Sequence, residues 1–104
     1  MAQVVNTNDF DSVVLQNDKK VLVDFFAPWC GPCQALVPVV DELSEEMKDE
    51  VVIVKVNIDE SPELAQKYAV MSIPTLKVFN GGEVVAEHVG AMGKDALKDF
   101  IKGA

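Results

Sequence analysis

The sequence predicts an α/β fold built on a mixed β-sheet, and three observations support this. Its 104 residues alternate between short apolar runs, typical of buried strands, and amphipathic segments, typical of helices. Residues 21–27 and 51–58 are nearly continuous apolar runs, as expected for strands covered on both faces of a largely parallel sheet. Gly81 and Gly82 separate the last two strand-like segments, which predicts an antiparallel hairpin. We expect residues 1–104 to form one domain.

The first half of the chain carries clear helix signals between its strands. Residues 3–5 suggest a short strand, and Asn6 and Thr7 offer N-cap oxygens to a helix whose apolar positions recur at i, i+3 and i+4. Between the two apolar runs, an apolar stripe of helical spacing begins at Cys33. Pro38 lies inside this stripe, which continues in phase beyond it. We therefore expect one kinked helix there, not two helices.

The second half predicts a short helix, a hairpin and a final helix. Ser61 followed by Pro62 marks a helix start. Residues 75–79 and 83–89 have strand-like composition, and the last helix follows Gly93. The resulting order is βαβαβαββα. Right-handed crossovers then place helices on both faces of the sheet.

Composition excludes several classes of protein. Seventeen acidic residues against nine lysines, with no arginine, give a formal charge of −8 at pH 7. That charge argues against nucleic acid or an anionic membrane surface as a partner. No apolar run approaches the ~18 residues that a membrane-spanning helix needs. Residues 1–20 lack a basic segment followed by an apolar one, so export is not signalled. We expect a soluble, cytoplasmic monomer.

The most informative stretch is Trp29-Cys30-Gly31-Pro32-Cys33, which joins a buried strand to a helix N-terminus. Unpaired backbone N–H groups and the positive end of the helix dipole stabilise a thiolate at Cys30. Pro32 suits a first helical turn, and Gly31 lets a partner's backbone approach. Cys33 begins the apolar stripe and is expected to be sheltered. This asymmetry predicts that an exposed Cys30 attacks a disulfide and that Cys33 then resolves the mixed disulfide.

Other uses of two cysteines fit this stretch less well. A structural zinc site needs four ligands, and the two cysteines with the distant His88 supply at most three, so we expect no metal. A purely structural disulfide across so short a loop would stabilise little. Inert buried thiols would not explain the position at a helix start. Redox chemistry is the interpretation that the residues favour.

Asp24 is the only charged residue in its apolar run and is therefore expected to be buried with a raised pKa. That makes it a candidate base for the proton of Cys33. Lys55, the lone cation of the other apolar run, would share its environment if the strands are neighbours. A structural polar pair, or an aspartate facing solvent at a strand end, is the alternative. For Pro74, only about 5–6% of such bonds are cis, which predicts trans.

Several ordered motifs at matching separations make the chain resemble the thioredoxin family over essentially its whole length. The matching segments, in chain order, are residues 23–25, residues 29–33, Pro38, Lys55, residues 57–59, residues 73–75 and Gly90. The resemblance implies a thioredoxin fold: a five-stranded mixed sheet of order 1-3-2-4-5 flanked by four helices. It also implies a protein dithiol–disulfide oxidoreductase that acts as a general reductant of disulfides in other proteins.

The resemblance assigns roles to individual residues. It implies that Cys30 is the nucleophile, that Cys33 is the resolving thiol, and that Asp24 assists proton transfer with Lys55 close by. It further implies that the bond before Pro74 is cis and that this proline packs against the disulfide, which replaces the trans expectation.

The resemblance also implies a surface and partners. The apolar surface that receives a substrate protein would comprise Trp29, Ile73, Pro74 and Gly90, and the loop residue Met71 suits such an adaptable surface. The resemblance further implies that no cofactor is bound and that a flavoprotein thioredoxin reductase supplies electrons from NADPH.

The sequence departs from the family pattern at several positions, Phe26 and Gln34 among them. Phe26 stands where bacterial members commonly have a second tryptophan, and Gln34 where a lysine usually follows the motif. The missing lysine leaves one cation fewer near the thiols, so these changes are expected to tune partner choice. A disulfide oxidase or isomerase, or a non-catalytic binding subunit using the same apolar surface, remain the alternative functions.

Overall fold

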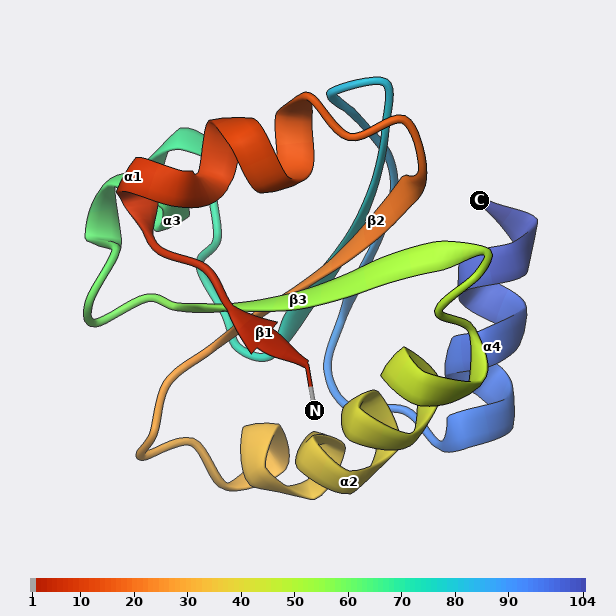
Figure 1. The fold of residues 1–104 in the computed structure, drawn as a ribbon. Coiled ribbons are helices and arrows are strands. Elements are labelled where there is room, and N and C mark those ends of the chain that lie inside the picture. Colours follow the sequence, from red (N-terminus) through yellow and green to blue (C-terminus); the bar gives the residue numbers. More distant parts are fainter. Residues whose placement is uncertain (1) are drawn as a thin grey trace.

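The computed structural model describes residues 2–104, which form a five-stranded sheet of order β1-β3-β2-β4-β5 (Figure 1). The strands are β1 (Gln3–Val4), β2 (Lys20–Phe26), β3 (Val51–Asn57), β4 (Thr75–Asn80) and β5 (Glu83–Val89). β3 runs parallel to both β1 and β2, whereas β4 is antiparallel to β2 and β5 to β4. The predicted order and the mixed character of the sheet are both confirmed.

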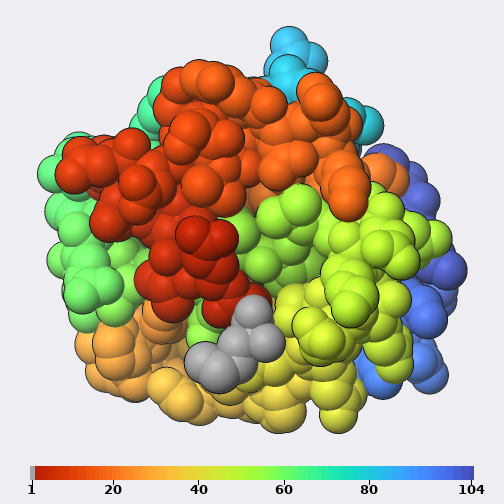
Figure 2. All heavy atoms as spheres, in the orientation of Figure 1, coloured from red at the N-terminus to blue at the C-terminus, as the bar shows by residue number. Residues whose placement is uncertain are grey.

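Helical segments cover both faces of this sheet, as the crossover rule predicted (Figure 1). They are α1 (Thr7–Phe10) with the π-helical segment η1 (Asp11–Leu15), α2 (Gly31–Glu46), α3 (Pro62–Lys67) and α4 (Lys94–Gly103). α1, η1 and α3 lie on one side of the sheet, and α2 and α4 lie on the other. The N-terminal segment (red in Figure 2) crosses the surface between α3 and the end of α2.

Two apolar cores result, one on each face of the sheet. Leu22 of β2 packs in the core under α2 and α4, while Val23 and Phe25 pack in the core under α1 and α3. All three side chains are fully buried. Each such side chain contributes about 1.5–3 kcal/mol on leaving water. This two-sided burial explains why β2 reads as an almost continuous apolar run.

The helices agree with the local sequence signals that predicted them. The Asn6 side chain caps α1 by accepting hydrogen bonds from the backbone N–H groups of Asn8 and Asp9. α2 is one helix that continues through Pro38, as the unbroken stripe predicted. α3 begins at Pro62. The Ser61 hydroxyl, however, does not cap α3, because it accepts the backbone N–H of Thr7 at 3.2 Å and ties the two helix starts together.

The predicted hairpin between β4 and β5 turns at two glycines. Gly81 and Gly82 have φ angles of 62° and 82°, the left-handed region that glycine enters without steric cost. Within residues 2–104, no helix is long and apolar enough to cross a membrane.

Candidate active site

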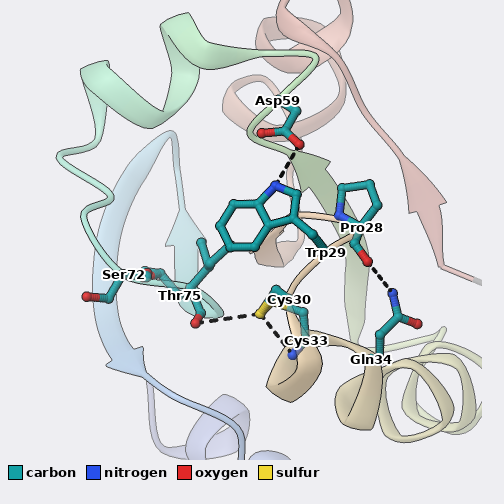
Figure 3. Close-up of a disulfide and its surroundings, with 9 residues drawn as sticks. Pro28, Trp29, Cys30, Cys33, Gln34, Asp59, Ser72 and Thr75 are labelled. Atoms are coloured by element: carbon teal, nitrogen blue, oxygen red, sulfur yellow. Dashed lines mark hydrogen bonds between the residues drawn. A yellow bond between two sulfur atoms is a disulfide. The ribbon is translucent and has the colours of Figure 1, made fainter.

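Cys30 and Cys33 form a disulfide at the start of α2, with their Cα atoms 5.2 Å apart (Figure 3). Cys30 is the N-cap residue of the helix, and its Sγ accepts the backbone N–H of Cys33 at 3.2 Å. Pro32 lies in the first turn, where its missing N–H costs nothing. The sulfur of Cys30 therefore lies where the helix N-terminus favours negative charge.

The expected exposure of Cys30 is wrong for the disulfide form. Cys30 is 5% exposed and Cys33 is 2% exposed, so the two sulfurs differ little in accessibility. Both belong to a small apolar cluster against which Ile73 packs. The Cys30 Sγ lies 3.8 Å from the carbonyl oxygen of Ile73, a residue 43 positions further along the chain. Burial by so distant a segment has no local sequence signal.

The loop before β4 meets the disulfide from the other side. The peptide bond between Ile73 and Pro74 is cis. The trans expectation from base frequencies is therefore wrong, and the expectation from the family resemblance is confirmed. The backbone N–H of Gly90 donates to the carbonyl oxygen of Pro74 at 2.8 Å, which ties the end of β5 to this loop. Ile73, Pro74 and Gly90 are thus brought to one end of the sheet beside Cys30.

Two large apolar side chains near the disulfide face solvent. Trp29 is 71% exposed and Met71 is 93% exposed. The Trp29 indole donates its Nε1–H to the Asp59 carboxylate at 3.0 Å (Figure 3), so the ring has a fixed partner despite its exposure. Exposed apolar groups of this size usually mark an interaction surface when they gather at one place.

Asp24 is buried beneath this end of the sheet, as predicted. It is 1% exposed, and no side chain or backbone group among the described residues hydrogen-bonds its Oδ1. Burial raises the pKa of Asp24 from its ordinary 3.8 to about 6, and the positive charge of Lys55 lowers it in part. Asp24 and Lys55 are direct partners in the β2–β3 pairing. The predicted neighbourhood of the two residues is confirmed.

Lys55 contacts Phe26, one of the residues that depart from the family pattern. Its ammonium lies 4.5 Å from the centre of the Phe26 ring, a cation–π contact. Phe26 and Asp24 lie two residues apart on β2 and so face the same side of the sheet. Phe26 also packs against the cluster of Ala27, Cys30 and Cys33. Asp24 therefore shares one side of the sheet with the disulfide cluster.

Three contacts were not predicted. The Trp29–Asp59 hydrogen bond is the first. The second is the side-chain amide of Gln34, which donates to the carbonyl oxygen of Pro28 at 3.1 Å and closes the loop that holds both cysteines. The third is buried Lys77 of β4, which forms an ion pair with Glu87 of β5. Only Lys77 had a usable sequence signal, since it is the single charged residue in the strand-like segment 75–79.

No group of three or more His, Cys, Asp or Glu side chains that could hold a metal ion occurs among residues 2–104. The disulfide at the start of α2 offers redox chemistry of its own. A dithiol at a helix N-terminus, with a buried carboxylate on the same side of the sheet and an apolar rim, is suited to thiol–disulfide exchange.

Comparison with known proteins agrees with this chemistry. Residues 1–103 match the thioredoxin family model. The chain is 45% identical to a thioredoxin of Rickettsia felis over 97% of its own length and 96% of the relative. It is 47% identical to a thioredoxin of Haemophilus influenzae, over 97% and 96%. It is 50% identical to an M-type chloroplastic thioredoxin of Chlamydomonas reinhardtii, over 97% and 72%. The chain therefore belongs to the thioredoxin family of protein-disulfide reductases, and the Cys30–Cys33 disulfide is its redox-active group.

Proposed function

We propose that the chain acts as a general reductant of disulfides in other proteins, working as a single domain and a monomer in the cytoplasm. The observation that carries this proposal is the N-cap position of Cys30, whose sulfur accepts a backbone hydrogen bond from the first turn of α2. That environment stabilises the thiolate, which is the attacking species in disulfide exchange.

The reaction proceeds in two exchange steps. The Cys30 thiolate attacks one sulfur of the substrate disulfide, forms a mixed disulfide and releases the other substrate sulfur as a thiolate, which takes up a proton. Cys33 then loses its proton and attacks the Cys30 sulfur. The Cys30–Cys33 disulfide forms, and the second substrate thiol leaves. Two electrons have passed from the dithiol to the substrate.

Asp24 is the proposed acceptor of the Cys33 proton, directly or through a water molecule. With a pKa of about 6, its carboxylate is ionised at pH 7 yet basic enough to take a proton. Its position beside Lys55 and on the face of β2 that carries Phe26 supports this role. Lys55 moderates the pKa of Asp24 by its positive charge.

The proposed substrate-binding surface consists of Trp29, Met71, Ile73 and Gly90. The exposure of Trp29 and Met71, and the proximity of Ile73 to the Cys30 sulfur, support it.

We propose that the loop around the disulfide is held in shape by Gly31, Pro32 and Pro74. A Cβ at Gly31 would meet no atom within 4 Å apart from its chain neighbours and its own helix, so this position borders open space.

The oxidised protein must be recharged with two electrons and two protons. We assign this to a flavoprotein thioredoxin reductase that draws on NADPH, as the family resemblance implies, and we propose that no cofactor is bound to the chain itself. Partners are this reductase and disulfide-containing proteins, and neither nucleic acid nor a membrane is among them.

Trapping of the mixed disulfide tests the proposed roles of the cysteines. Reduced Cys33→Ser protein, incubated with an oxidised protein substrate, is expected to form a stable covalent adduct through Cys30, visible by non-reducing electrophoresis and mass spectrometry. The matched Cys30→Ser variant is expected to form little or none. Equal trapping by both variants, or trapping only through Cys33, would contradict the assignment of nucleophile and resolving thiol.

A further inference from the structure

Four chain segments surround the disulfide at one end of the sheet. The ends of β2, β3 and β5 and the start of β4 meet there, as the strand register shows. The segments at this edge are residues 26–34, 57–61, 69–75 and 89–93. They contain only two charged residues, Asp59 and Glu60, both exposed and both negative. The rim of the redox surface is thus apolar with an acidic side.

The lysines that flank these segments in sequence each contact another side chain, and Lys77, after the third segment, pairs with Glu87. The ammonium of Lys55 lies over the Phe26 ring, and that of Lys67 lies 5.6 Å from the centre of the Tyr68 ring. Lys94 follows the last segment and pairs with Glu42 and Glu46 of α2, at 3.4 Å and 2.6 Å.

Gln34, directly after the second cysteine, is neutral and bonded to the loop. Within residues 26–34, 57–61, 69–75 and 89–93, the charged side chains are therefore those of Asp59 and Glu60, both negative.

Asp59 is the better placed of the two acids. One carboxylate oxygen accepts the Trp29 indole N–H at 3.0 Å, and Figure 3 shows the other pointing away from the ring. Trp29 is the residue immediately before Cys30. The negative charge is consequently held against the indole of the residue that precedes Cys30, on a side chain that stays exposed.

We propose that this rim selects disulfides flanked by lysine or arginine, and that Asp59 is the specificity-determining residue. The inference rests on the proposed reductase function and names its substrate class. A basic side chain beside the substrate cysteine pairs with the free oxygen of Asp59 while the disulfide lies against the apolar surface. A rim charge pair of this kind changes a rate by about two- to fivefold and is weakened by salt.

Two peptide disulfides of identical sequence, except for lysine or glutamate on either side of the cysteine, test the proposal. The initial rate of reduction of each by the reduced protein is measured at low ionic strength and at about 0.5 M salt. We expect the lysine peptide to react about fivefold faster at low salt, with the difference shrinking at high salt.

Two variants that each remove one negative charge distinguish the effect of Asp59 from that of the protein's overall negative charge. Asp59→Asn keeps an acceptor oxygen for the indole and is expected to lower the rate ratio of the two peptides about two- to fourfold. Glu45→Gln removes an exposed charge at the far end of α2, near the start of β3, and is expected to leave the ratio unchanged. Trp29 fluorescence checks that the indole environment is retained.

The outcomes are distinct. A purely structural role for Asp59 would slow both peptides alike and leave their ratio unchanged, which would overturn the proposal. Equal rates for the two peptides, or the same fall in ratio for both variants, would also overturn it. Failure to reduce either peptide would overturn the proposed function, and this inference with it.

Discussion

Replacing Asp24 by asparagine is expected to stabilise the oxidised protein at neutral pH. Asp24 is 1% exposed, and its Oδ1 has no hydrogen-bond partner among residues 2–104. At pH 7 the folded chain therefore holds a buried negative charge, which Lys55 compensates only in part. Asparagine has nearly the same shape and no charge, so the variant removes the cost of ionisation while keeping the packing.

The size of this effect follows from the two pKa values. In the folded protein the pKa of Asp24 is about 6, against an ordinary value of 3.8. At about 1.36 kcal/mol for each pH unit, this corresponds to about 3 kcal/mol. Because the folded pKa is the higher one, the contribution of this group to stability is fully present below pH 3.8 and is lost as the pH rises through about 6. Because Asp24→Asn has no titrating group at this position, it loses no such stability over the same pH range.

Denaturant unfolding at a series of pH values measures the effect. We compare the free energy of unfolding of the oxidised wild type with that of Asp24→Asn from about pH 4 to pH 8. The comparison requires that the two proteins have similar slopes of unfolding free energy against denaturant concentration. The difference is expected to grow from near zero to about 3 kcal/mol in favour of the variant. Asp49→Asn, at an exposed position, is the control and is expected to show no such growth. A variant no more stable than wild type at pH 8, or a difference independent of pH, would refute this reasoning.

Other predictions concern packing and helix capping, each read out as a change in the free energy of unfolding. Glu87→Gln leaves the buried ammonium of Lys77 without its carboxylate and is expected to cost about 1–2 kcal/mol, whereas Lys77→Met, which removes the charge itself, is expected to cost less. A larger loss for Lys77→Met would contradict this. Asn6→Ala removes the cap of α1 and is expected to cost about 1 kcal/mol; no loss would mean that the cap is dispensable. Gly82→Ala forces a side chain into φ +82° with its Cβ 3.0 Å from the Leu15 carbonyl oxygen, and is expected to cost about 1–2 kcal/mol; a neutral effect would show that the turn relaxes.

Local patterns predicted much of the fold, because strands buried on both faces and helix starts can each be recognised from a few consecutive residues. The charge of Asp24 inside an apolar run was enough to predict its burial and its raised pKa. The register that places it beside Lys55 needed the topology, which the family resemblance supplied. No sequence pattern predicted the π-helical form of η1, since its apolar periodicity does not distinguish it from an α-helix.

The parts of the site that were missed depend on contacts between distant segments. Burial of Cys30 requires Ile73, which reaches it only once β4 lies beside β2. The hydrogen bond from Trp29 to Asp59 joins residues 30 positions apart. The cis bond before Pro74 is rare by base frequency, and only the resemblance pointed to it. Tertiary contacts of this kind cannot be read from spacing or composition alone.

The redox equilibrium of Cys30 and Cys33 against graded glutathione buffers tests most directly the claim that the chain is a reductant. The fractions of dithiol and disulfide are obtained by thiol alkylation and mass spectrometry at each buffer ratio, and they give the reduction potential. We predict a potential clearly more negative than that of the glutathione pool, so that the dithiol donates electrons to other disulfides. A potential near or above that of glutathione would contradict the account and identify an oxidase or isomerase instead.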